Sequence, residues 1–109
     1  MTYLVRLLPR AKLQLMNAAL WWAENRSLDQ AVLWIDGFEA ALQSLANNPE
    51  AWPLAPECDS VHLQIREMTF GLRSRKTHRA IFEVREQEVL VFAVRHLAQD
   101  LLSGDDFSI

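Results

Sequence analysis

Cysteine is nearly absent from this sequence of 109 residues, and the single Cys58 limits what the protein can do. One cysteine can form neither an internal disulfide nor a cysteine zinc cluster, which fits a reducing compartment. A reactive thiol needs an electropositive setting, whereas Cys58 stands between Glu57 and Asp59. We therefore expect Cys58 to be chemically inert.

Long apolar runs are also missing. No stretch approaches the roughly 20 apolar residues of a membrane-spanning helix, because charged residues recur along the whole chain. The apolar run that follows Met1 is too short for a secretory signal peptide. We expect a cytoplasmic protein that has no membrane partner.

Glycine and proline are scarce, with three and four residues, and 50% of the chain is hydrophobic. This composition is typical of a globular protein rather than a disordered one. At this length we expect residues 1–109 to form a single domain.

The formal net charge is −3, which argues against indiscriminate binding to nucleic acid. The segment 62–82 nevertheless carries a local net charge of +4, since five basic residues stand there against one glutamate (5 − 1 = 4). A locally basic sheet on an acidic protein indicates a directed contact with an anion. A solvated strand face that keeps a sheet soluble explains the same charges equally well. The five basic residues are Arg66, Arg73, Arg75, Lys76 and Arg79.

The hydrophobic patterns predict six regular elements in the order β-α-α-β-β-β. The strands are expected at residues 3–8, 62–70, 75–85 and 88–96, and the helices at residues 10–25 and from residue 28 to the Asn47-Asn48-Pro49 stop. Residues 50–60 are expected to form a loop, and both connections between the last three strands to be of hairpin length. A small antiparallel meander with two helices on one face is an α+β domain. Its other face is expected to be open and to carry the functional site.

Local signals set the details of the helices. Ser27 and Gln30 form a capping-box pattern at the start of the second helix. Gly37 lies inside this helix, and we expect it to allow a close approach of the first helix, which carries Trp21 and Trp22.

Apolar patterns predict the core. Leu13, Met16 and Leu20 form one stripe of the first helix. Together with Leu15, Ala19 and Trp22 beside it, this stripe makes a wide apolar face that is expected to be buried between the sheet and the second helix. The run Leu90-Val91-Phe92-Ala93-Val94 is apolar on both faces, which predicts a strand covered on both sides. Core packing is favoured over base stacking for all four tryptophans, Trp21, Trp22, Trp34 and Trp52.

Three strand residues suggest a chemical site. Strand alternation is expected to bring Arg66, Arg79 and one of Arg95 or His96 together on the uncovered face. Two guanidinium groups and an imidazole near one phosphate can form a nuclease site that needs no metal. The alternative is that the arginines are solvated or paired with carboxylates and that His96 is structural.

The other cations of this region are expected to bind the target, and no metal or cofactor is expected. The three histidines do not fall at zinc-ligand spacings, and no carboxylate completes a known pattern. The expected target-binding residues are Arg73, Arg75, Lys76 and Arg95.

Several segments together resemble the RelE/ParE toxins of type II toxin–antitoxin systems. They cover nearly the whole chain and occur in the order found in that family, so the ordered set is more specific than any one of them. The segments are Val5-Arg6-Leu7-Leu8-Pro9-Arg10-Ala11, residues 19–27, Asn48-Pro49-Glu50, residues 53–57, Ile65-Arg66-Glu67-Met68, residues 77–82 and Val94-Arg95-His96.

The resemblance implies a toxin that arrests growth and is neutralised by an antitoxin encoded beside it. Members of the RelE type cut ribosome-bound mRNA without a metal, and Arg66 and Arg79 fall where these ribonucleases carry strand arginines. His96 falls near their last catalytic position, and Arg79→Ala is expected to abolish growth arrest without unfolding the domain. Members of the ParE type inhibit DNA gyrase and need no nuclease site.

Both targets therefore remain open, as does a third reading, a non-catalytic RNA- or protein-binding module of the same fold. The acidic net charge, together with Gln64 and Glu67 in the second strand, departs from the strongly basic ribosome-dependent members. The antitoxin is expected to be an acidic, amphipathic segment that folds onto a basic sheet face and an apolar groove beside the helices.

Overall fold

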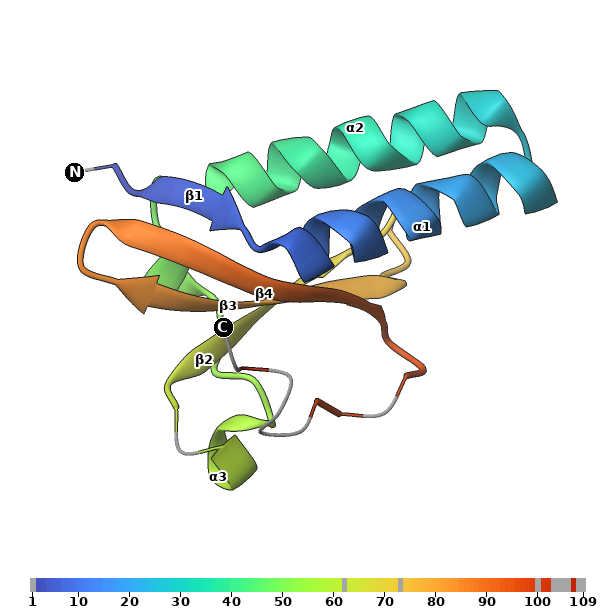
Figure 1. Ribbon diagram of the computed structural model, residues 1–109. Coiled ribbons are helices and arrows are strands. Elements are labelled where there is room, and N and C mark those ends of the chain that lie inside the picture. Colours follow the sequence, from blue (N-terminus) through green and yellow to red (C-terminus); the bar gives the residue numbers. More distant parts are fainter. Residues whose placement is uncertain (1, 62, 73, 100, 103–106, 108–109) are drawn as a thin grey trace.

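The computed structural model describes residues 2–61, 63–72, 74–99, 101–102 and 107. Its elements follow the predicted β-α-α-β-β-β order, with two short helical turns inside the segment that was expected to be a loop (Figure 1). They are β1 (Leu4–Leu7), α1 (Pro9–Asn25), α2 (Leu28–Ser44), the 3-10 helix η1 (Pro49–Ala51), α3 (Cys58–Val61), β2 (Ile65–Phe70), β3 (His78–Arg85) and β4 (Glu88–His96).

The helix boundaries follow from the signals in the sequence. Pro9 is the first residue of α1, where its missing N–H costs no hydrogen bond. At the start of α2 the Ser27 hydroxyl accepts a hydrogen bond of 3.1 Å from the Gln30 amide, so the predicted cap is confirmed. In the described part of the chain, no helix has the length and apolar character needed to cross a membrane.

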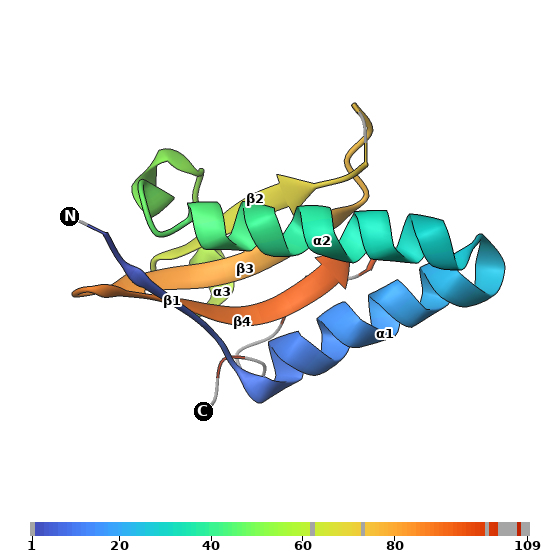
Figure 2. The ribbon, with the colours of Figure 1, turned by 90° about the horizontal axis from the view of Figure 1, so that it is seen from above.

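The described strands form one sheet in the order β1-β4-β3-β2. The predicted antiparallel meander of β2, β3 and β4 is confirmed. The first strand joins it through a parallel pairing with β4, so the sheet is mixed. Figure 2 shows α1 and α2 side by side over the sheet. This is the predicted α+β architecture.

Only part of the apolar face expected for α1 is buried. Leu13, Met16 and Leu20 are 62%, 52% and 53% exposed, whereas Leu15 and Ala19 are buried. Small side chains on the inner face allow α1 to lie close to both α2 and β4. The prediction of a buried face is therefore confirmed for Leu15 and Ala19 and wrong for the stripe of Leu13, Met16 and Leu20, which is an exposed apolar surface.

The close approach at Gly37 also involves a different partner. A Cβ atom at this position would lie 3.1 Å from the Phe70 ring of β2. The ring centroids of Phe38 and Phe70 are 4.7 Å apart, so this ring belongs to the aromatic core under α2. Gly37 therefore makes room for the sheet and not, as expected, for the tryptophans of α1.

The face of the sheet opposite the helices is covered, contrary to the expectation of an open surface. α3 lies on this side in Figure 1, and residues from the segment before it and from the C-terminal region pack there. A β-bulge at Ile81/Phe82 lets both Phe92 and Ala93 face this side. The two-sided burial expected for residues 90–94 is confirmed. The buried members of this second cluster are Ala55, Ile65, Ile81, Leu90, Phe92, Ala93, Leu102 and Phe107.

Candidate functional site

Arg66 and Arg79, which the sequence predicted to act together, lie on opposite faces of the sheet. Arg66 is paired in register with Phe82, which belongs to the core under the helices. Arg79 is paired with Thr69 and alternates with Ile81, which belongs to the second cluster. The predicted arginine pair is therefore not assembled.

The surroundings of Arg66 are unsuited to a phosphate. Its Nη1 atom donates a 2.7 Å hydrogen bond to the Trp52 carbonyl. The hollow beside it is also lined by Glu50, Glu83 and Glu86. Three carboxylates around one guanidinium repel an anion, so this hollow is a poor place for an anionic substrate.

Arg79 is a buried ion-pair residue. Its side chain is 4% exposed, and it forms salt bridges with Glu57 and with Glu67, the latter at 2.9 Å. The hydrogen bonds that Arg79 donates to Glu57 are the main reason why the pKa of Arg79 is raised. The Nη1 and Nη2 groups of Arg79 already donate hydrogen bonds to carboxylates, so Arg79 cannot bind an external anion through them without breaking these bonds. The expectation that it lies on an open surface is wrong.

Glu57 is the residue that the sequence reading missed. It is fully buried, and besides Arg79 it accepts a 3.0 Å hydrogen bond from the Leu102 amide. Burial alone would raise the pKa of Glu57, but the bonds from Arg79 and Leu102 outweigh it and lower this pKa. Glu57 thus ties the loop before α3 and the C-terminal segment to β3.

His96 lies on the helix side of the sheet, with His78 directly opposite it in register. The two imidazole centroids are 5.0 Å apart. Arg66 is paired with Phe82, which is four residues beyond His78 in β3. At 3.3 Å per residue, Arg66 therefore lies roughly 13 Å along the sheet from the two histidines. Arg95 is paired with Arg79, so it belongs to the other face. The predicted catalytic residues Arg66, Arg79 and His96 are thus distributed over three separate places.

His78 is held neutral by its surroundings. It is 9% exposed and packs against Trp34, with ring centroids 4.9 Å apart. Its Nδ1 atom lies 2.8 Å from the Thr77 hydroxyl. Burial, with a smaller contribution from the charge of His96, lowers the pKa of His78 to about 4.

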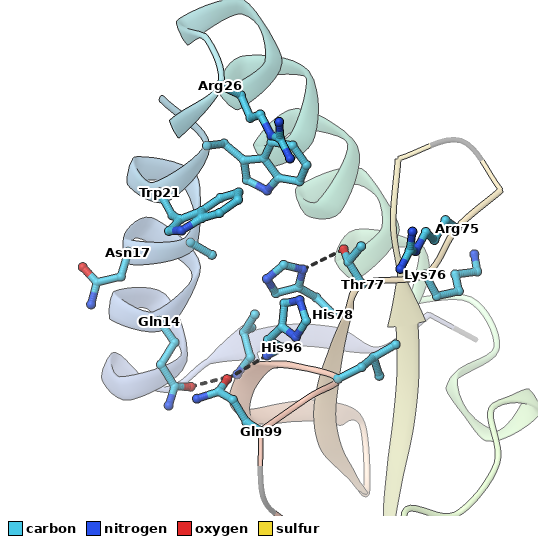
Figure 3. A pocket seen from close by; sticks show the side chains of 14 residues that line it. Gln14, Asn17, Trp21, Arg26, Arg75, Lys76, Thr77, His78, His96 and Gln99 are labelled. Carbon is cyan, nitrogen blue, oxygen red and sulfur yellow. Dashed lines mark hydrogen bonds between the residues drawn. The ribbon is translucent and has the colours of Figure 1, made fainter. Parts of the chain in front are cut away.

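A groove of about 850 Å³, called the main groove below, lies between α1 and the ends of β3 and β4. Figure 3 shows Trp21 and Arg26 on the helix side, and Arg75 and Lys76 on the opposite side. His78 and His96 lie between these two walls (Figure 3). Of the predicted target-binding residues, Arg75 and Lys76 therefore share one groove. Arg73 lies outside the described residues.

Hydrogen bonds hold the floor of this groove in place. The Gln14 side-chain oxygen accepts a 2.8 Å bond from the Val94 amide, at a point where β4 has no partner in β1. The Gln99 side-chain oxygen accepts a 2.7 Å bond from the His96 amide. The end of β4 is thereby fixed relative to α1.

Trp21 and Arg26 were not expected to belong to a site. Trp21 is 50% exposed, so core packing is wrong for this tryptophan, although it holds for Trp34. Trp21 lies in the C-terminal half of α1 and Arg26 directly follows this helix, at the end that overhangs the sheet in Figure 2. The helical pattern of the sequence contains no signal for that overhang.

The wall that carries Arg75 and Lys76 depends on Gly71. The connection between β2 and β3 spans residues 71–77 and is longer than the predicted hairpin turn. A Cβ atom at Gly71 would lie 1.8 Å from the Arg75 carbonyl oxygen and 2.7 Å from the Lys76 Cα atom. The connection can fold back in this way only if residue 71 has no side chain.

Gly71→Ala is therefore expected to lower the free energy of unfolding by about 1–3 kcal/mol, because the backbone at Arg75 must move. Urea titration of the purified variant measures this change. Ser74→Ala, an exposed substitution in the same connection, is the control and should be close to neutral. Equal stability of the two variants would contradict the close contact.

The described residues contain no group of three or more His, Cys, Asp or Glu side chains able to hold a metal ion. The groove itself is lined by cations, amides, a hydroxyl, two imidazoles and an exposed indole ring.

Comparison with known proteins identifies the family. No curated protein matches the chain. A chain of the solved structure described as "Chromosomal ParDE TA system from P. aeruginosa" is similar in fold, with a TM-score of 0.70 at 14% identity. The similarity covers 87% of this chain and 96% of that one. The family model for the ParE toxin of the type II toxin–antitoxin system parDE matches residues 5–101. That match spans every helix and strand described above, apart from the first residue of β1, and the chain belongs to the ParE toxin family of type II toxin–antitoxin systems.

Proposed function

We propose that this toxin arrests growth by inhibiting DNA gyrase through surface contacts, and not by cutting mRNA. The observation that carries the proposal is the buried ion pair of Arg79 with Glu57, on the face opposite Arg66. A metal-free nuclease needs free cations beside a proton-transferring group. A gyrase inhibitor that acts by binding needs no such cluster.

The chain is the toxin of a type II toxin–antitoxin system, so it has a cognate antitoxin as its partner. The exposed stripe of Leu13, Met16 and Leu20 is a suitable surface for an amphipathic helix of that antitoxin. A second groove of about 440 Å³ lies beside it, between β1, α1 and α2, and Lys12 and Met16 are among its lining residues. We propose this region as the antitoxin surface. It supplies the expected apolar groove beside the helices, but not the expected open basic sheet face, since that face is covered.

The gyrase proposal is tested with purified toxin in two parallel assays. In the first, we expect the toxin to block supercoiling of relaxed plasmid by gyrase and to accumulate cleaved DNA. In the second, ribosome-bound mRNA should remain intact at the same toxin concentration. The antitoxin encoded beside the toxin, added before gyrase, is the control and should restore supercoiling. Cut mRNA together with normal supercoiling would overturn the proposal.

A further inference from the structure

The main groove concentrates positive charge on an acidic protein. Arg26, Arg75 and Lys76 line it, together with His96, and no Asp or Glu is among its described lining residues. Within the described part of the chain, the first three cations form no salt bridge. Three cations without a salt bridge on the walls of one groove make the local electrostatic potential positive. They attract an anion even though the net charge of the chain is −3.

An exposed indole ring accompanies these cations. Trp21 is 50% exposed, and its ring meets Trp22 edge to face, at 5.4 Å between centroids and an interplanar angle of 89°. This contact helps to hold the Trp21 ring in place, so little further order has to be imposed on it when a ligand stacks there. Bases of single-stranded nucleic acid stack on aromatic side chains in this manner, while cations follow the phosphates.

The remaining lining residues are polar but uncharged. Gln14, Gln99 and Thr77 place amide and hydroxyl groups along the groove. Burial keeps His78 neutral, so the floor adds no fixed charge there. Amides and hydroxyls can form hydrogen bonds with base edges and sugars. The volume of about 850 Å³ is that of a site for a small ligand or a short segment of a polymer.

We infer that this groove binds a single strand of nucleic acid, with a base stacked on Trp21 and phosphates held by Arg26, Arg75 and Lys76. The inference goes beyond the proposed inhibition of gyrase, since it concerns direct binding of nucleic acid by the free toxin. An acidic peptide is the competing occupant. It is disfavoured because it makes no use of an exposed ring beside the cations, and because the apolar stripe suited to a helical partner lies on a neighbouring face of α1.

Charge reversal on one wall is the first test. A labelled single-stranded oligonucleotide of mixed sequence, in DNA and RNA forms, is titrated with free toxin at low salt and followed by fluorescence anisotropy. Lys76→Glu should weaken binding by roughly ten-fold or more. Arg10→Glu, which makes the same charge change on α1 outside the groove, should alter affinity by less than about two-fold. Binding of either DNA or RNA with this pattern supports the inference. The form that binds more tightly shows whether the groove prefers DNA or RNA.

The salt dependence counts the phosphates in contact. Each phosphate neutralised on a single strand contributes about −0.7 to the slope of log affinity against log salt concentration. Three cations therefore predict a slope of roughly −2, and Lys76→Gln should make it shallower by about 0.7. A slope that Lys76→Gln leaves unchanged would overturn the assignment of Lys76 to a phosphate.

Base stacking is tested separately with Trp21→Leu. This variant should bind the oligonucleotide about five-fold or more weakly, whereas its affinity for an abasic strand of equal length should match that of the unsubstituted toxin. Circular dichroism confirms that each variant is folded. The inference is overturned if no binding occurs, if Lys76→Glu and Arg10→Glu behave alike, or if the unsubstituted toxin binds base-containing and abasic strands equally. It is also overturned if an acidic peptide of the same charge binds as tightly as the oligonucleotide.

Discussion

Replacing Arg79 by alanine is expected to destabilise the domain by about 3–5 kcal/mol, because the substitution leaves Glu57 buried without its cationic partner. Each kcal/mol lowers the melting temperature of a domain of this size by roughly 4 °C, so we expect a decrease of about 12–20 °C. Thermal and urea unfolding of the purified variant measure the effect. The sequence reading, in contrast, predicted that Arg79→Ala abolishes growth arrest and leaves the fold intact.

The double variant Glu57→Gln/Arg79→Met is the matched control for Arg79→Ala. It removes both buried charges together, and the Gln side-chain oxygen can still accept the hydrogen bond from the Leu102 amide. Replacing both partners of a buried pair by groups of similar volume is often close to neutral. We therefore expect the double variant to regain most of the lost stability. If Arg79→Ala melts at the temperature of the unsubstituted protein, the ion pair does not have the role assigned here.

The second large effect is a loss of stability in mild acid caused by His78. Its pKa is about 4 in the folded chain, against an ordinary value of 6.5. As the pH falls, the imidazole of residue 78 is protonated in the unfolded chain before it is protonated in the folded one. The contribution of His78 to the free energy of unfolding is therefore fully present above pH 6.5 and is lost as the pH falls towards 4. The decrease from this group amounts to about 2 kcal/mol at pH 5 and about 3 kcal/mol below pH 4.

Urea unfolding at a series of pH values, compared between the protein and His78→Phe, isolates this contribution. The difference in unfolding free energy between the two proteins should shift in favour of His78→Phe as the pH falls from 6.5 to 4. The pKa of Glu57 is lowered below its ordinary 4.5, so its own loss of stability begins only at the acid end of this range. Parallel pH profiles of the two proteins would contradict the burial of a neutral His78.

The sequence was sufficient to predict the two long helices, the four strands and the fold class, but not the short helices η1 and α3. The apolar periodicity, Pro9 and the Ser27 cap define the helices closely, since these signals are local. Within each single strand, the prediction of which side chains share a face was also correct. Arg66 does lie on the same face of β2 as Met68, and the side chains of Arg79 and Ala80 do point to opposite faces of β3.

The error arose when the faces of neighbouring strands were matched. β2 carries an apolar residue on each face, Ile65 on one and Met68 on the other, so its pattern does not say which face lies under the helices. The helix face carries Met68 and therefore Arg66, which separates the two arginines. The apolar run 90–94 did contain the warning, since a strand that is buried on both sides excludes an open face.

The other missed features depend on contacts between residues distant in sequence. Glu57 is 22 residues from Arg79 and 45 from Leu102, and no local pattern links them. The groove requires the overhang of α1, which places Trp21 across from Lys76. The packing of helices on a sheet sets such distances, whereas periodicity shows only which face of each element is apolar.

The most direct test of the central claim, that inhibition of gyrase requires no nuclease cluster, uses the folded double variant Glu57→Gln/Arg79→Met in the supercoiling assay. This protein lacks the guanidinium of Arg79 altogether. We predict that it blocks gyrase at the same concentration as the unsubstituted toxin. A double variant that is folded and still binds the antitoxin, but no longer inhibits gyrase, would contradict the account.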